Sequence, residues 1–384
     1  MMKSKSVFLS LWGVIFFIFS CAPGLMPASG IKETTAPALT SPSDMSSWEV
    51  EWSNIQAAAR KERSVAVYAT GTAFQARAMQ IKVMKEKYGI ELEMTSGRGE
   101  EIAQRFLTQR RAGIYTTDIY IGGATTILTQ IKPAGLLEPL EPMFLLPEVR
   151  DSGAWVEGRF LDKDKLVFAF IAYPNVPMTV NSDLVKEGDV KSFKDLLNPK
   201  WKGKIVIDDP TVNGSGLKQF QFVGSIIMNI DYWRELAKLE PAISRDKRLP
   251  VEWLTRGKYS IGMALTPGTV LEFQKAGAPL KTVSAEEGAY VTSGSGCVVY
   301  INKAPHPNAA KVFLNWLLSR EGGLIYSEAT GTQSARLDVP TSHLDANETR
   351  KEGVKYWVSD REEFILQQPE SAKIALDIFG HLMR

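Results

Sequence analysis

Apolar residues follow two alternating spacings along the chain from about residue 48 onward. Residues 64–70 (SVAVYAT) alternate and are rich in β-branched side chains, which predicts a β-strand. Residues 74–88 carry apolar side chains every three or four positions, which predicts one face of a helix ending at Gly89. This succession predicts βαβ units around a parallel sheet. Further strands are expected at 90–96 and 118–123, and helices at 100–113 and from residue 124.

A second set of strand and helix patterns occupies roughly residues 175–285. An extended apolar stretch at residues 166–173 precedes it, and one strand over residues 291–302 is expected to follow it. The rest of the chain is expected to be mostly helical, with loops near residues 330–347. The patterns therefore predict an α/β protein with two strand–helix units. The remaining strands are expected at 178–181, 204–208 and 259–265, and the remaining helices at 192–197, 217–229, 267–277 and 307–319.

The N-terminus has the pattern of an export signal. Lys3 and Lys5 precede an apolar run of 13 residues, which is shorter than the roughly 20 needed to span a bilayer. The run ends in Ser20-Cys21, which resembles the lipidation box of bacterial lipoproteins, although Phe19 is larger than the usual residue. An ordinary signal peptide with a chance cysteine is the alternative. We expect a signal peptide at residues 1–20, lipidation of Cys21, and a flexible Pro/Ser/Thr-rich tether over residues 21–47.

Charge and cysteine content exclude several classes of protein. The net charge is +2 over 384 residues, and removal of Lys3 and Lys5 with the signal peptide leaves about zero, which argues against a nucleic-acid partner. Cys21 and Cys297 are the two cysteines, so a zinc site built on cysteines and a C-x-x-C pair are both excluded. Cys297 is expected to be a small buried apolar residue.

Five junctions between strands and helices share a composition of glycine and hydroxyl residues: TGT at 70–72, SGRG at 96–99, GGAT at 122–125, NGSG at 213–216 and TPGT at 266–269. Ligands of open α/β sheets bind at the carboxyl ends of strands, where free N–H groups of helices suit anions. Helix caps and turns are the alternative explanation. The candidate ligand-binding residues are Thr70, Gly71, Thr72, Arg98, Gly123, Ala124, Thr125, Tyr173, Ser215, Gly216 and Thr266.

Signatures of catalysis are missing from the sequence. His306, His343 and His381 lie far apart along the chain, and each is expected to be solvated or to cap a helix. The sequence contains no G-x-S-x-G elbow, P-loop or H-E-x-x-H motif. The acid pair Asp208-Asp209 is expected at the end of a strand. We therefore expect no catalytic residue, no metal and no cofactor.

Several stretches together resemble the extracellular solute-binding proteins of bacterial ABC importers, in the branch with ferric-ion and phosphonate binding proteins. The most distinctive is FKDLLNPKWKGKI at residues 193–205, and the resemblance extends from about Val65 to Asp338. Its motifs are mainly turns and helix starts. The other stretches that match the family are KYGIE at 87–91, AG at 112–113, TDI at 117–119, GLL at 135–137, VNSDLV at 180–185, APHPNAAK at 304–311 and LLS at 317–319.

The resemblance implies a two-lobed, type II-like periplasmic-binding-protein fold with a ligand cleft between the lobes. Lobe 1 is expected at residues 48–169 and lobe 2 at 170–284, while residues 285–384 supply a returning strand, part of lobe 1 and C-terminal helices. Strands crossing between the lobes are expected within residues 168–180 and 282–292. The implied mechanism is hinge closure around a solute, followed by delivery to an ABC permease. A monomer is expected, outside the cytoplasm, in the periplasm or at the outer face of the cytoplasmic membrane.

The ferric branch binds iron through a histidine, an acid and two tyrosines, and the matching positions here hold Thr72, Gly123 and Thr266-Pro267. A bare ferric ion is therefore not expected, and hydroxyls with Arg98 suit an anionic or zwitterionic organic solute better. A ferric chelate that carries its own ligands stays open. A bilobal sensor and a lipid-anchored enzyme on the same fold stay open as well.

Lipidation of Cys21 is testable by substitution. We expect Cys21→Ser to move the protein from the membrane to the soluble fraction, because the acyl chains provide the anchor. Mass spectrometry of the wild type should show the acyl mass. Membrane retention of the variant, with no acyl mass on the wild type, would contradict lipidation.

Overall fold

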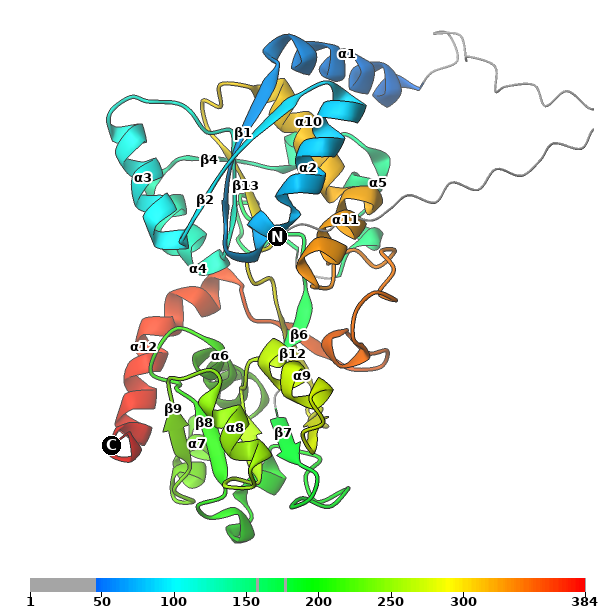
Figure 1. Ribbon diagram of the computed structural model, residues 1–384. Coiled ribbons are helices and arrows are strands. Elements are labelled where there is room, and N and C mark those ends of the chain that lie inside the picture. Colours follow the sequence, from blue (N-terminus) through cyan, green and yellow to red (C-terminus); the bar gives the residue numbers. More distant parts are fainter. Residues whose placement is uncertain (1–45, 157–158, 176–177, 384) are drawn as a thin grey trace, which may run out of the picture. The chain divides into compact units, whose positions relative to one another are not determined.

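A computed structural model describes residues 46–156, 159–175 and 178–383 (Figure 1). Ser46–Arg384 clusters as one compact unit. The expected signal peptide, Cys21 and nearly all of the expected tether lie outside the described residues. Within the described part, no helix combines the length and the apolar character needed to cross a membrane.

The first sheet confirms the expected parallel βαβ units, because β1 pairs in parallel with both β2 and β3. The strand order is β2-β1-β3-β13-β4, with β5 also paired to β13, which runs antiparallel to β3. Its strands are β1 (Ser64–Thr70), β2 (Glu91–Gly97), β3 (Ile119–Gly122), β4 (Leu137–Glu138), β5 (Phe168–Ala169) and β13 (Cys297–Ile301). The helices around it, which with the sheet form lobe 1, are α1 (Ser47–Glu62), α2 (Arg77–Val83), α3 (Gly99–Arg111), α4 (Ala124–Thr126), α5 (Pro147–Arg150), α10 (Pro307–Leu318) and α11 (Arg320–Thr330).

The second sheet has the order β11-β7-β10-β8-β9 and mixes parallel and antiparallel pairs. Its strands are β7 (Met178–Asn181), β8 (Ile205–Asp208), β9 (Ala242–Ser244), β10 (Ile261–Met263) and β11 (Leu280–Val283). The helices packed on it, which with the sheet form lobe 2, are α6 (Ser215–Gln221), α7 (Ile230–Ala237), α8 (Leu249–Thr255) and α9 (Pro267–Lys275).

A third, small sheet joins the two lobes. It has the order β14-β12-β6, from β6 (Tyr173–Asn175), β12 (Ala289–Thr292) and β14 (Tyr356–Val358). β6 and β12 lie where crossing strands were expected, whereas β14 was not predicted from the sequence. We call this element the hinge sheet.

The single strand expected over residues 291–302 is wrong. The chain leaves β12 after Thr292, turns through residues 293–296, and enters β13 at Cys297. Gly294 has φ +53°, in the left-handed region that glycine adopts freely, and a Cβ on Gly296 would lie 2.4 Å from Ile171 side-chain atoms. The segment therefore turns where alternation alone predicted a continuous strand.

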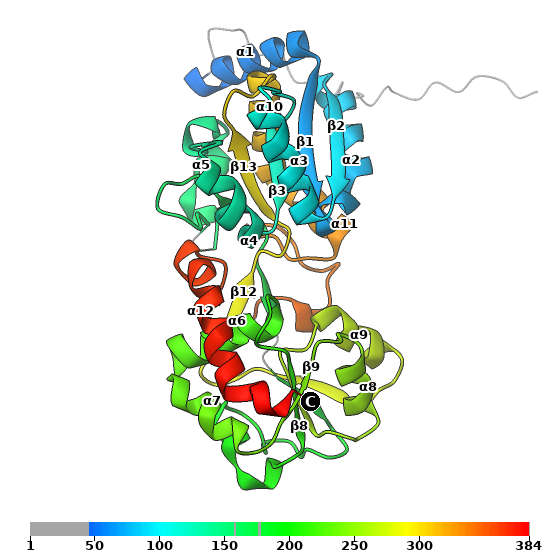
Figure 2. The ribbon, with the colours of Figure 1, turned by 90° about the vertical axis from the view of Figure 1, so that its left-hand side faces the viewer.

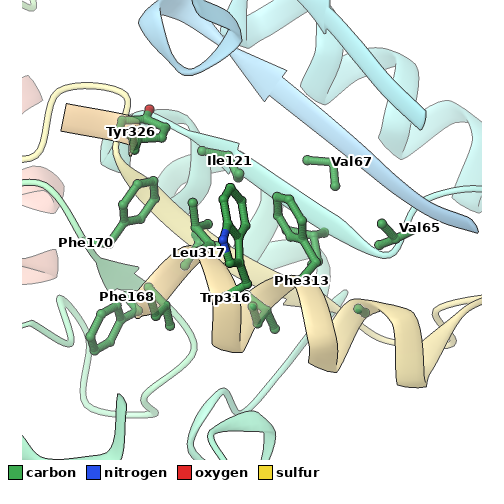
Figure 3. Packing of buried hydrophobic residues seen from close by; sticks show 14 of the residues in the cluster. Val65, Val67, Ile121, Phe168, Phe170, Phe313, Trp316, Leu317 and Tyr326 are labelled. Carbon is green, nitrogen blue, oxygen red and sulfur yellow. The ribbon is translucent and has the colours of Figure 1, made fainter. Parts of the chain in front are cut away.

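Helix α10 anchors the core of lobe 1. Phe313, Trp316 and Leu317 face Val67 of β1 and Ile121 of β3 (Figure 3), and Trp316 is 1% exposed. Burying one large apolar side chain stabilises a fold by roughly 1.5–3 kcal/mol. This helix therefore holds β1 and β3 in place, and with them the loops at their carboxyl ends.

Asp118 ties the start of α10 to the same strands. One carboxylate oxygen accepts the Ala66 N–H at 2.7 Å, the other accepts the His306 N–H at 2.7 Å, and the His306 ring Nδ1 lies 3.0 Å from the carboxylate. Burial raises the pKa of Asp118, and these contacts oppose the rise. His306 stands at the N-terminal end of α10, but its side chain makes no capping hydrogen bond there and contacts Asp118 instead.

Helix α12 (Glu362–Phe379) packs on both lobes (Figure 2). At its N-terminal end Lys132 of lobe 1 pairs with Glu362 at 2.8 Å, and Ile365 joins the core of lobe 1. Nearer its C-terminus, Ala375 and Phe379 belong to the core of lobe 2. The helix is thus a further link between the lobes beside the hinge sheet.

Candidate functional site

The loops after β1 and β3 lie side by side at the carboxyl edge of the first sheet. Thr70 donates to the Ile121 carbonyl at 3.5 Å. A Cβ on Gly122 would lie 2.5 Å from the Thr70 hydroxyl oxygen, so a larger residue there would displace the Thr70 side chain. Thr72 is exposed and Thr125 half-buried, whereas Ala124 packs into the core. The structure therefore brings the first and third predicted loops together.

The turn at residues 293–296, which we call the 293–296 loop, was missed by the sequence analysis. A Cβ on Gly71 would lie 2.3 Å from Ser295 Oγ, and one on Gly294 would lie 2.7 Å from Tyr173 Oη. A Cβ on Gly123 would lie 3.5 Å from the Gly294 carbonyl oxygen. Three predicted residues therefore converge on this loop. Its sequence with Thr292, TSGSG, repeats the composition of the five junctions, which is the signal that could have revealed it.

Arg98 is exposed at the position preceding α3. Its guanidinium makes no hydrogen bond or ion pair with the described residues, Glu100 and Glu101 included. The following residue, Gly99, lies against Thr126, because a Cβ there would be 3.1 Å from the threonine hydroxyl. The second predicted loop is therefore next to the third, with a positive charge at its tip that no described residue neutralises.

The remaining predicted residues belong to loops of lobe 2. Ser215 begins α6, and its carbonyl accepts the Tyr290 hydroxyl at 3.3 Å. The Gly216 N–H is already committed, because it donates to Asp208 Oδ2 at 2.9 Å. Thr266 precedes α9 and is half-buried.

One hollow is lined by residues of both lobes. It has a volume of about 310 Å³, and Thr125 of lobe 1 lines it together with Asn213 and Leu217 of lobe 2. Thr129 of lobe 1 lines it as well, and α12 contributes Ile365, Leu366, Gln368, Pro369 and Ala372. Two predicted loops from different lobes therefore open onto the same space.

Unlike Arg98, the carboxylate beside the lobe 2 loops is committed to structural contacts. Asp208 ends β8, as expected, and Lys247 pairs with it. Burial raises the pKa of Asp208, opposed by Lys247, and burial with the nearby Asp360 charge raises the pKa of Tyr173 to about 12. Tyr173 therefore presents a neutral hydroxyl. Among the residues that the structure describes, no cluster of three or more His, Cys, Asp or Glu could hold a metal ion.

Comparisons with known proteins agree with this architecture. A family model of bacterial extracellular solute-binding proteins matches residues 79–352, which is more than half of the chain. An uncharacterized protein of Haemophilus influenzae is 24% identical over 251 residues, covering 63% of this chain and 69% of its own.

Two solved structures show the same fold at low identity. The FutA (IdiA) protein of Trichodesmium, solved with iron and citrate, has 17% identity, a TM-score of 0.63, and coverage of 83% of this chain and 99% of its own. AfuA of Actinobacillus pleuropneumoniae, solved with fructose-6-phosphate, has 20% identity, a TM-score of 0.55, and coverage of 83% and 98%. The chain thus has the two-lobed, type II fold of periplasmic binding proteins that the sequence predicted.

Ferric-ion binding is testable directly. The sequence resemblance puts Thr72, Gly123 and Thr266-Pro267 at the positions of the ferric branch's iron ligands, and we therefore expect purified protein to bind no free Fe(III). Addition of ferric citrate should produce no visible charge-transfer band, and dialysis should remove the iron. A band with stoichiometric iron, and without citrate, retained after dialysis would overturn this expectation.

Proposed function

The chain belongs to the family of bacterial extracellular solute-binding proteins, the extracytoplasmic components of ABC importers, and we propose that its solute is a small anionic or zwitterionic organic molecule. The solute binds between the lobes, the lobes close around it, and the closed form docks on a permease. Closure is favoured only to the extent that the solute contacts both lobes.

The observation that carries this proposal is the Arg98 guanidinium, which no described residue pairs with, in a group of loops rich in neutral donors. A guanidinium offers a planar fork that matches carboxylate or phosphate. The neighbouring loops carry Thr72 and Thr125, and the Tyr173 hydroxyl lies against the 293–296 loop; these groups can donate without adding charge. One positive group accompanied by neutral donors suits a solute with one anionic group and further polar atoms.

The same arrangement favours capture without chemistry. His306 is engaged by Asp118, and His343 Nε2 lies 2.8 Å from Ser327 Oγ. Neither stands in one of the five candidate ligand-binding junctions, and a general acid–base pair needs two such groups converging on a substrate. We therefore propose a binding protein rather than an enzyme.

The anchor and the state of assembly complete the proposal. Acyl chains on Cys21 hold the protein at the membrane, and the tether at residues 21–47 lets the folded unit reach its permease. The protein acts as a monomer, since each molecule carries both walls of its own site.

A ferric chelate is the second candidate. It is favoured by the similarity to the Trichodesmium protein, whose structure contains iron and citrate. In a chelate such as ferric citrate, citrate oxygens occupy the coordination sites of the metal and carboxylates face outward. The Arg98 guanidinium suits such carboxylates.

Native mass spectrometry of freshly purified protein tests the proposal and separates the two candidates. We expect a co-purified organic solute with a carboxylate or phosphate group. A mass containing iron would favour the chelate. A cationic or uncharged solute would overturn the proposed solute class, and a turnover product formed from the bound molecule would overturn the binding role.

Substitution of Arg98 tests its role once that solute is identified. We expect Arg98→Ala to weaken its binding about ten- to a hundredfold in titration calorimetry, which is the loss of one charge-assisted contact of roughly 1.5–3 kcal/mol. The melting temperature should stay the same, because the exposed side chain contributes little to the core. Arg111→Ala, an exposed arginine at the other end of α3, is the matched control and should bind normally. Equal affinities of Arg98→Ala and wild type would show that Arg98 does not contact the solute.

A further inference from the structure

Asp360 is a buried carboxylate that follows the hinge strand β14. It is 1% exposed, although none of the predicted functions requires a charge at this position. Its Oδ2 atom accepts the Thr292 hydroxyl at 2.9 Å, the Ser293 N–H at 2.6 Å and the Ser293 hydroxyl at 2.6 Å. One carboxylate oxygen therefore holds the start of the 293–296 loop by three hydrogen bonds.

The other carboxylate oxygen is held from lobe 2. The Lys218 ammonium pairs with Asp360 Oδ1 and also donates to the Thr292 hydroxyl at 3.0 Å. Lys218 belongs to α6, one turn after Ser215, which is a predicted solute contact. The side chains of Asp360 and Lys218 are 2% and 16% exposed, so water screens the pair poorly. A single carboxylate thus connects a loop of the first sheet to a helix of the second.

The charge of Asp360 is kept in the folded protein. Burial would raise the pKa of its carboxyl, but the attraction of Lys218 and the hydrogen bonds from Ser293 outweigh burial and hold that pKa below its usual value. A buried ion that loses one partner is strongly disfavoured, because the remaining charge has no water to stabilise it. The contact is therefore sensitive to any displacement of either lobe.

The 293–296 loop is the place where predicted contacts of lobe 1 meet. Gly71 lies against Ser295, and both Gly123 and Tyr173 lie against Gly294. A shift of the loop by a fraction of an ångström would displace Gly71, Gly123 and Tyr173, because all three are already in close contact with it.

We propose that Asp360 is a positioning residue that fixes the 293–296 loop and, through Lys218, couples it to α6. A solute that displaces the loop in lobe 1 then also displaces the start of α6 in lobe 2. A solute that displaces α6 likewise displaces the loop. This inference rests on the proposed function only in taking these loops as the walls of the solute site. The contacts themselves are present without a solute.

Hydrogen–deuterium exchange of the solute-free protein, read by mass spectrometry, tests the coupling. In Asp360→Asn we expect exchange at residues 292–296 to accelerate about ten- to a hundredfold, because the Ser293 N–H loses a charged acceptor. In Lys218→Met the same loop should also exchange faster, although the substitution lies on lobe 2. The matched control is Lys247→Met, which breaks the neighbouring pair with Asp208 near the start of α6 and should leave the loop unchanged.

The milder variant Ser293→Ala keeps the test decisive if Asp360→Asn does not fold. It removes one neutral donor, and we expect exchange in the loop to rise about two- to tenfold. Unchanged exchange of the loop in Asp360→Asn, or in Ser293→Ala in its place, would overturn the positioning role, and so would an equal rise over the whole chain. An unchanged loop in Lys218→Met would overturn the coupling. The exchange experiment uses no solute, so a negative result would leave the proposed solute capture untouched. Failure to find a solute would likewise leave the result of the exchange experiment untouched.

Discussion

The chain has to cross between its two sheets more than once, and each crossing must keep its backbone hydrogen bonds satisfied away from water. The hinge sheet meets this constraint: β12 pairs with β6 on one side and β14 on the other. Because the crossings bond to one another, they act as one narrow ribbon rather than as separate linkers. The loops that leave the ribbon, including the turn at residues 293–296, are consequently set at fixed positions between the lobes.

Much of the fold could be predicted because local pattern and tertiary context agree there. The alternation at residues 64–70 corresponds to β1, and the apolar face at residues 307–319 corresponds to α10. The strand expected over residues 291–302 failed for a physical reason. Its apolar alternation continues on both sides of Gly294, while the turn is imposed by Ile171 and Tyr173, which are distant in sequence. Strand β14 has only three residues, all half-buried, and such a strand leaves no periodic signal.

Composition pointed to the junctions that form the candidate site, whereas their arrangement in space could not be predicted from the sequence. Junctions rich in glycine and hydroxyls indicated Gly71 and Gly123, which lie against the 293–296 loop, and Thr125, which lines the hollow between the lobes. The partner loop at residues 293–296 has the same composition, but it follows a hinge strand instead of starting a helix. Asp360 could not be found at all from the sequence, because its importance comes from contacts with Lys218 and Ser293, which lie 142 and 67 residues away. Only folding brings these groups into one low-dielectric space.

Cys297, at the start of β13, shows what burial means for a protein exported from the cytoplasm. Its side chain is 0% exposed, and its thiol donates to Ser293 Oγ at 3.0 Å. Burial, with the charge of Asp360, raises the pKa of the thiol to about 12. Oxidants and disulfides react with the thiolate, which this environment almost eliminates at neutral pH. Cys297 therefore stays reduced and unreactive even in an oxidising compartment. A cysteine introduced on the surface of the folded unit would be far more reactive than Cys297 toward a thiol-directed label.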